Sequence, residues 1–308
     1  MTINQVVKIQ NLTKKFGSVT VLDGINLEVH SNQCFGILGP NASGKTTLIR
    51  MISGISSKTS GEINVFGMNI DSSARAIKAK LGVVPQEENL DVNLTVEENL
   101  LMHARYFGLS KITARERANK WLKFFHLYDR KLEKIESLST GLKKRLLIAR
   151  AMIGDPQLLI LDEPSDNLDF WCQELVWNKL KQLREEGVTQ IVATHNIEEA
   201  ERLCSNLIIL DSGKIRKQGD PLGLIANEVP PEVIEISLKD IKCNTILDRV
   251  GKEVHCYKLQ RGKLFMYAYD GLKIMDVLRQ MGIGKIDMVF RKSNLRDVFM
   301  QFSDKELK

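Results

Sequence analysis

The residues with the clearest chemical potential lie in the segment GPNASGKTT, Gly39 to Thr47. It fits the pattern G-x-x-x-x-G-K-[ST], whose glycines, lysine and hydroxyl are spaced to hold phosphate groups. Backbone N–H groups of such a turn, together with the positive end of the following helix, replace the water that a triphosphate loses on binding. The sequence therefore predicts a nucleotide site formed by Asn41, Ala42, Ser43, Gly44, Lys45, Thr46 and Thr47.

Individual side chains in this segment have separate expected roles. Lys45 is expected to reach the β- and γ-phosphates of ATP, and Thr47 to contact the α-phosphate. The Thr46 hydroxyl is expected to bind Mg²⁺. Gly39 and Gly44 are expected to adopt backbone conformations that a side chain would block.

Two adjacent acids, Asp162 and Glu163, end the apolar run LLIL and precede a proline. Buried carboxylates are costly unless they serve a metal or a partner. Because side chains alternate along a strand, we expect the two acids to point in different directions. We predict that Asp162 is a second-sphere ligand of Mg²⁺ and that Glu163 polarises the attacking water. The alternative, acids that only decorate a helix start, is weaker beside a phosphate-binding loop.

Elements that could position these residues follow an alternating pattern. Apolar runs such as QCFGIL, LGVV, QLLIL, TQIVAT and NLIIL are separated by helical patterns such as VEENLLMHARYF and QELVWNKLKQLREE. This alternation predicts an α/β fold with a mainly parallel sheet. Before it, VVKIQ and VTVLDGINLEV alternate like antiparallel strands, which predicts a small β subdomain.

The pattern changes near Glu228, where ANEVPPE carries a Pro-Pro pair typical of a linker. Beyond it, the predicted order is β (VIEISL), α (LKDIKCNTILDRV), β (EVHCYKLQ), β (KLFMYAYDG), α (LKIMDVLRQM), β (KIDMVFR) and a last helix (NLRDVFMQFSDKEL). This order is typical of a ferredoxin-like module. We expect a first domain at residues 1–225 and an α+β domain at residues 232–308, the latter for packing or dimerisation.

Composition narrows the remaining possibilities. The net charge of +6 is spread along the chain, which favours a solvated surface over a nucleic-acid interface. The five scattered cysteines form no CxxC pair, which favours reduced thiols in the cytosol. The first residues lack the apolar core of a signal peptide, and no stretch reaches the roughly 18 apolar residues of a membrane span. A membrane-spanning part would therefore come from a partner chain.

The stretch LSTGLKKRLLIARAMIGDPQLLILDEPSDNLD, Leu138 to Asp169, resembles the signature helix, Walker B strand and D-loop of ATP-binding cassette (ABC) ATPases. Phe16 matches the family's adenine-stacking aromatic, Gln86 the Q-loop glutamine and His195 the switch histidine. This resemblance implies the P-loop NTPase fold of ABC type over residues 1 to about 220, with a helical subdomain at about 87–153. VVPQEENLDVNLTVEENLLMHARYFG, EEAERLC and NLRDVFMQF further resemble ABC-2 type nodulation-factor (lipo-oligosaccharide) and drug-export ATPases.

The resemblance implies an ATP-driven homodimer that moves an ABC-2 type transmembrane permease from the cytoplasmic face of the membrane. ATP would lie between the Walker motifs of one chain and Ser139 and Gly141 of the other, whose donors would contact the γ-phosphate. His195 would act in hydrolysis, while Gln86 would sense the γ-phosphate beside Mg²⁺. Taken singly, His195 could be structural, Gln86 a turn residue and Phe16 a core residue. No nucleic-acid partner is expected.

Four positions depart from the family pattern: Ala42 and Asn167 stand where glycine is frequent, and Thr140 and Leu142 replace a glycine and a glutamine of the signature. Ala42 is tolerable if its φ stays negative, and asparagine tolerates left-handed backbone better than most residues. Thr140 and Leu142 could weaken the contact to the partner's γ-phosphate. Nearby, the run from Lys143 to Arg145 is expected to be a solvated helix face.

Two other functions compete with transport. A soluble ABC ATPase acting on ribosomes or DNA is disfavoured, because the chain has one P-loop and no sustained heptads between Lys45 and Ser139. A module that binds nucleotide without hydrolysing it is disfavoured because Glu163 and His195 are both present.

Overall fold

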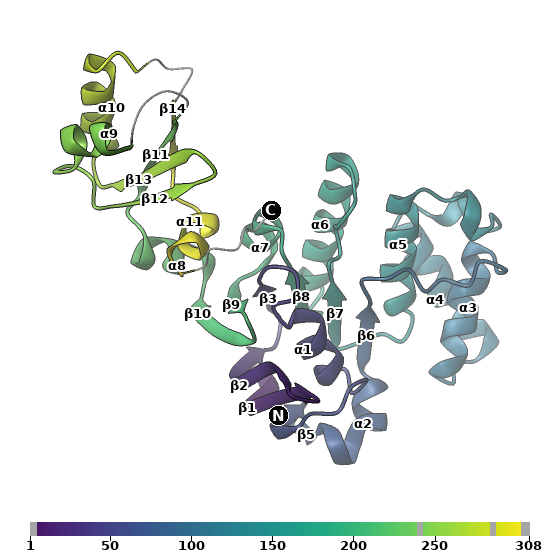
Figure 1. The fold of residues 1–308 in the computed structure, drawn as a ribbon. Coiled ribbons are helices and arrows are strands. Elements are labelled where there is room, and N and C mark those ends of the chain that lie inside the picture. Colours follow the sequence, from purple (N-terminus) through teal and green to yellow (C-terminus); the bar gives the residue numbers. More distant parts are fainter. Residues whose placement is uncertain (1–4, 239–242, 284–287, 303–308) are drawn as a thin grey trace. The chain divides into compact units, whose positions relative to one another are not determined.

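This computed structural model describes residues 5–238, 243–283 and 288–302. Its contacts separate a unit that ends at Gln218 from a unit formed by Gly219–Leu307. The predicted first domain extended to residue 225, whereas helix α8 (Pro221–Glu228) falls in the second unit because it packs against α11 (Leu295–Phe302). The two units are described separately (Figure 1).

The first unit opens with the predicted antiparallel strands. The sheet has the order β2-β1-β4-β5, and each neighbouring pair is antiparallel. Apolar residues on one face of these strands are buried while their neighbours in sequence are more exposed, as expected for a half-buried sheet. Its strands are β1 (Gln5–Phe16), β2 (Val19–His30), β4 (Ser60–Val65) and β5 (Met68–Asn69).

A second sheet of the same unit has the order β10-β9-β3-β8-β7-β6. The pairs β9–β3, β3–β8, β8–β7 and β7–β6 are parallel, which confirms the predicted α/β core. Carboxyl ends of neighbouring parallel strands share one edge, so the segments that follow β3, β8 and β7 lie side by side. The strands are β3 (Cys34–Leu38), β6 (Leu81–Val84), β7 (Leu158–Asp162), β8 (Thr189–Thr194), β9 (Asn206–Asp211) and β10 (Lys214–Gly219).

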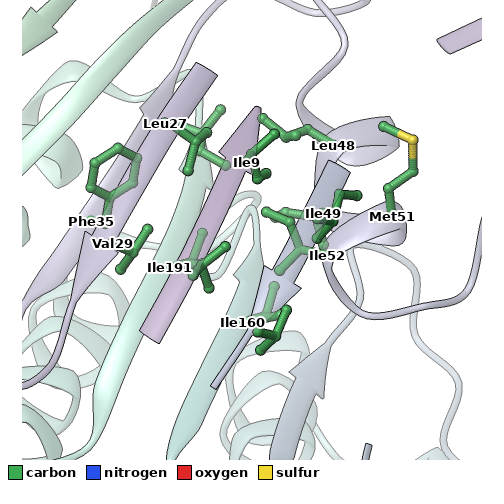
Figure 2. Packing of buried hydrophobic residues seen from close by; sticks show 14 of the residues in the cluster. Ile9, Leu27, Val29, Phe35, Leu48, Ile49, Met51, Ile52, Ile160 and Ile191 are labelled. Atoms are coloured by element: carbon green, nitrogen blue, oxygen red, sulfur yellow. The ribbon is translucent and has the colours of Figure 1, made fainter. Parts of the chain in front are cut away.

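One hydrophobic core joins the two sheets to helix α1 (Lys45–Ile52). Figure 2 shows Leu48, Ile49 and Ile52 of α1 among side chains of both sheets, including Ile9 and Ile160. All of these side chains are at most 3% exposed. Because each fully buried aliphatic side chain contributes about 1.5–3 kcal/mol, this packing fixes α1, and with it the loop that precedes it, against the sheet edge. Three further helices of this unit are α2 (Ile70–Lys78), α6 (Phe170–Glu185) and α7 (Ile197–Leu203).

Three helices between β6 and β7 form the helical part of this unit, within the predicted range 87–153: α3 (Val96–Tyr106), α4 (Lys111–Phe124) and α5 (Thr140–Ala151). Each begins at a side-chain cap. Thr95 and Glu98 form a capping box on α3, Ser110 caps α4, and Ser139 caps α5. Such caps are worth about 0.5–2 kcal/mol each, so they define where each helix starts. Within the ranges described, no helix is both long and apolar enough to cross a membrane.

The second unit has the predicted element order. After α8 come β11 (Glu232–Ser237), α9 (Cys243–Val250), β12 (Cys256–Gln260), β13 (Lys263–Ala268), α10 (Gly271–Gln280), β14 (Met288–Lys292) and α11. The sheet order is β12-β13-β11-β14, with all neighbours antiparallel. Parts of the predicted elements at 239–242, 284–287 and 303–308 lie outside the described residues. The predicted linker is wrong in its first half, because α8 extends through Glu228.

Candidate nucleotide site

The loop between β3 and α1 is built around two glycines. Gly44 has a φ of 109°, which only glycine adopts readily, and it precedes the first residue of α1. Gly39 is required for space instead, since a Cβ there would lie 2.2 Å from the carbonyl oxygen of Leu210. The predicted special backbone conformation is confirmed for Gly44 and is wrong for Gly39, where the space beside Leu210 rather than the backbone angle requires glycine.

A cavity of about 440 Å³ lies at this loop. It is lined by Val21, Asn41, Ala42, Ser43, Gly44, Lys45, Thr46, Thr47, Gln86 and Glu163. All seven predicted loop residues therefore line the same cavity as Gln86 and Glu163. Gln86 follows the end of β6, and Glu163 follows the end of β7. Val21, on β2, is the member that the sequence did not indicate, because an apolar residue in a strand carries no chemical signal of its own.

Lys45, Glu163 and His195 form a buried chain of interactions. Lys45 Nζ lies 3.2 Å from Glu163 Oε1, and His195 Nδ1 lies 2.8 Å from Glu163 Oε2. The Lys45 ammonium also donates to the carbonyl oxygens of Gly39 at 2.9 Å and Pro40 at 3.2 Å. Since Lys45 and Glu163 are 5% and 3% exposed, this pair is largely shielded from water. His195 thus contacts the acid, as a structural histidine or a catalytic one would.

The charges of this group are set by their neighbours. Burial alone would raise the pKa of Glu163, but the hydrogen bond from His195 and the charge of Lys45 outweigh it and lower the pKa. The hydrogen bond with Glu163 raises the pKa of His195 despite its burial. Glu163 is therefore ionised near neutral pH and able to accept hydrogen bonds.

Asp162 fits the chemistry of a magnesium site. It is 3% exposed, and burial raises its pKa, while the hydrogen bond with the Thr46 side chain opposes that change. Its Oδ1 is buried and has no hydrogen-bond partner among the described residues. A second cavity, of about 190 Å³, is lined by Thr46, Gln86 and Asp162 together with neighbouring residues. A buried, unpartnered carboxylate oxygen beside a hydroxyl and an amide is the oxygen-rich donor set that Mg²⁺ prefers.

Glu163 lies beyond the end of the strand, so strand alternation does not set the direction of its side chain. Strand β7 ends at Asp162, and Glu163 has a φ of 50°, in the left-handed region. Its N–H donates to the Ala193 carbonyl of the neighbouring strand at 2.9 Å. This turn, rather than strand alternation, sends the Glu163 side chain toward Lys45. A non-glycine residue in this conformation costs about 1–2 kcal/mol, a strain that is typical of functional positions.

Two of the departures from the family pattern have left-handed backbone. The expectation that Ala42 keeps a negative φ is wrong, because its φ is 63°. The methyl group is accommodated in a left-handed conformation and carries strain that a glycine would not. Asn167 has a φ of 59°, which agrees with the expectation that asparagine was tolerated there for its left-handed backbone.

Three predicted site residues lie away from the loop cavity. Phe16 is 54% exposed, so the alternative that it belongs to the core is wrong. Ser139 is exposed at the start of α5, where its hydroxyl accepts from Leu142 N at 3.4 Å. Gly141 is buried, and a Cβ there would lie 2.6 Å from Cys172 Sγ of α6. Packing against α6 within the same chain is therefore sufficient to require glycine at position 141.

The expectation of a solvated face from Lys143 to Arg145 is wrong. Lys144 is 7% exposed, and burial lowers its pKa while the charges of Glu199, Asp162, Asp166 and Glu163 oppose that change. Arg145 donates to the Phe125 carbonyl at 3.0 Å, and Lys143 lies 3.3 Å from Glu88. These contacts run from α5 to residues distant in sequence, so helical periodicity alone did not reveal them.

Comparison with known proteins agrees with this geometry. Residues 22–166 match the family described as ABC transporter. The chain is 37% identical to Nod factor export ATP-binding protein I of Cupriavidus metallidurans, over 98% of this chain and 99% of that protein. The protein of the same name from Rhizobium meliloti is 38% identical, over 98% and 89%.

Solved structures agree as well. A dimeric ATP-binding cassette in a post-hydrolysis state, bound to ADP and Pi, is 30% identical with a TM-score of 0.64, over 70% of this chain and 98% of that one. The cbiO1 protein of Clostridium perfringens is 28% identical with a TM-score of 0.68, over 73% and 92%. With the loop Gly39–Thr47, the acid pair and His195 following neighbouring strands of one sheet, this chain belongs to the ABC transporter family of ATP-binding, ATP-hydrolysing proteins.

Proposed function

We propose that this chain is the ATP-hydrolysing motor subunit of an ABC-2 type exporter and drives a separate transmembrane permease. The observation that carries the proposal is the buried contact of Glu163 with both Lys45 and His195, beside a loop cavity that Lys45 and Glu163 line. The relatives described above are named for export, which supports transport over a soluble ATPase acting on ribosomes or DNA.

ATP binding starts at the loop. Backbone amides between Asn41 and Thr46 and the N-terminus of α1 supply donors for the phosphates. Lys45 is already held 3.2 Å from Glu163, and the triphosphate offers its ammonium a more highly charged partner. Thr47 contacts the α-phosphate. The exposed ring of Phe16 stacks on adenine, an interaction worth about 1–3 kcal/mol, so it tunes affinity without deciding it.

Thr46, Asp162 and Gln86 are the residues that would hold Mg²⁺. When bound there, the ion would supply positive charge to offset the negative charge of the triphosphate. Asp162 offers the buried Oδ1 described above. The hydrogen bond between the Asp162 carboxylate and the Thr46 hydroxyl keeps these two groups next to each other. Gln86 lines both cavities, so it is placed to respond to the γ-phosphate and to the metal together.

Hydrolysis requires a water molecule aligned with the γ-phosphate. Glu163 orients this water and accepts its proton, since its lowered pKa keeps it ionised. His195 holds Oε2 of the same carboxylate at 2.8 Å and so fixes the direction in which Oε1 points. When the phosphates draw Lys45 away from Oε1, that oxygen becomes available to the water.

Two copies of the chain act together. In the head-to-tail homodimer, Ser139 and Gly141 of one copy complete the ATP site of the other. Because the Ser139 hydroxyl accepts from Leu142 N, it keeps its own hydrogen for a γ-phosphate oxygen. ATP therefore stabilises the dimer, and phosphate release loosens it. Through the permease, the chain works at the cytoplasmic face of the cell membrane.

The test uses the full chain, purified alone and together with a candidate permease, chosen as a membrane protein with about six hydrophobic spans encoded by a neighbouring gene. We expect Mg²⁺-dependent phosphate release that Lys45→Ala abolishes, and co-purification of the detergent-solubilised membrane protein. Co-sedimentation with ribosomes, in place of binding to the membrane protein, would contradict the exporter function. Loss of nucleotide binding in the wild type would remove the whole proposal.

A further inference from the structure

A second buried link ties the acid segment to the helix that follows the switch histidine. Glu199 lies on α7, one helical turn beyond His195, and is 1% exposed. Its Oε1 accepts from Ser165 Oγ at 2.6 Å and from Trp177 Nε1 at 3.0 Å. Ser165, itself 1% exposed, lies just after Glu163 on the same segment. The two segments are thus joined twice, by Glu163 with His195 and by Ser165 with Glu199.

The link is part of a rigid local arrangement. Asn196 caps α7 by accepting from Glu199 N at 3.2 Å, and Asn196 N donates to Thr194 Oγ1 at 2.9 Å. The backbone from the end of β8 to Glu199 is therefore fixed by hydrogen bonds on both sides of His195. A displacement of Ser165 would therefore move Glu199, and with it the start of α7 and the imidazole of His195.

The other side of the link is held by α6. Gln173 Nε2 donates to the carbonyl oxygens of Ser165 at 3.3 Å and Leu168 at 3.1 Å, and Trp177 of the same helix reaches Glu199. Lys144 of α5 contributes positive charge near this buried acid, which Coulomb attraction favours in a site of low dielectric. Residues of α6, α7 and the acid segment therefore meet at the Glu199 carboxylate, and the charge of Lys144 on α5 acts on it as well.

We propose that Glu199 is a positioning residue for ATP hydrolysis, which acts through Ser165 to keep His195 aligned with the carboxylate of Glu163. The inference rests on the proposed function, because it concerns the geometry of the same acid and histidine. Glu199 does not line the loop cavity, so it acts on turnover rather than on nucleotide binding.

Ser165→Ala tests the link, since it removes the hydroxyl donor and leaves the Trp177 bond in place. We expect kcat to fall by about 10-fold, the size of effect that losing one buried hydrogen bond produces, with KM for ATP within about 2-fold. Glu199→Gln keeps an oxygen acceptor for both donors, so we expect it to retain more activity than Glu199→Ala. Amide hydrogen exchange over residues 195–203 should quicken in Ser165→Ala even without nucleotide.

Glu174→Gln is the matched control. It removes the exposed ion pair between Glu174 and Arg202, which joins α6 and α7 without touching Glu199. We expect unchanged kcat and unchanged exchange over residues 195–203 in this variant. Wild-type kcat in Ser165→Ala, or an equal loss in Glu174→Gln, would overturn the positioning role. Absence of turnover in the wild type would instead overturn the proposed function, while the exchange measurement would still decide the link.

Discussion

Nδ1 of His195 lies 2.8 Å from Oε2 of Glu163, while the other oxygen of that carboxylate lies 3.2 Å from Lys45 Nζ. One buried acid, Glu163, is therefore shared between Lys45 of the loop and His195. A nucleotide that attracts Lys45 leaves Glu163 with His195 as its remaining partner in this group. Under the proposed function, we expect substrate binding and activation of the acid to be parts of one rearrangement.

Replacement of that acid should separate binding from turnover. In Glu163→Gln we expect ATP binding to persist and phosphate release to fall by about 10²–10⁴-fold, the usual contribution of a positioned general base. The dimer should then accumulate with ATP, as size-exclusion chromatography would show. Lys45→Ala is the opposite control, because it should lose binding first. Near-normal phosphate release in Glu163→Gln would remove Glu163 from the role of base.

The same pair predicts a pH dependence of stability. The pKa of His195 is raised from 6.5, so its contribution to the free energy of unfolding is complete below that value and is lost as the pH rises through the folded pKa. The pKa of Glu163 is lowered from 4.5, so its contribution is present above that value and is lost as the pH falls. The pair therefore stabilises the fold most between these two values.

Denaturant unfolding without nucleotide measures this effect. The difference in unfolding free energy between wild type and His195→Gln should be larger near pH ~6 than near pH ~9, since within this pair His195, and not Glu163, loses its charge as the pH rises. In a Glu163→Gln background this pH dependence should disappear. If it persisted there, the raised pKa of His195 would have a different origin.

Ala42 carries left-handed strain that glycine would release. Ala42→Gly removes a cost of about 1–2 kcal/mol but adds about 0.4–1 kcal/mol of unfolded-state entropy, so we expect a gain in stability of up to ~1.6 kcal/mol. Ala76→Gly, at an exposed position of α2, is the control and should destabilise by about 1 kcal/mol. Thermal or denaturant unfolding measures whether each variant is more or less stable than the wild type. Equal losses in both variants would contradict the strain.

Gly141 should matter to the single chain as well as to the dimer. In Gly141→Ala the new Cβ meets Cys172 Sγ at 2.6 Å, and overpacking of this kind costs about 1–3 kcal/mol. Adding Cys172→Ala removes that sulfur and leaves the Cys172 Cβ at 3.2 Å, so part of the stability should return. A double-mutant cycle of unfolding free energies measures the recovery. If only ATP-dependent dimerisation changed, the packing role would be wrong.

Much of the fold was predictable from sequence because its signals are local. The alternating β1 and β2, the apolar strands of the parallel sheet and the order of elements after Glu232 follow from hydrophobic periodicity. The glycines and the lysine of the phosphate-binding loop were recognisable because their backbone and charge requirements are met within a few residues.

Tertiary structure decided the features that depend on residues far apart in the chain. Packing between elements buries Lys144 and brings Glu199 into contact with Ser165. Neither feature can be recognised from the hydrophobic periodicity of the sequence. The direction of the Glu163 side chain also escaped prediction, because a left-handed turn held by the neighbouring strand overrides strand alternation. The sequence by itself therefore determined which chemical groups the site contains. Their distances, charges and mutual support arise only when the parallel sheet brings the ends of its strands to one edge.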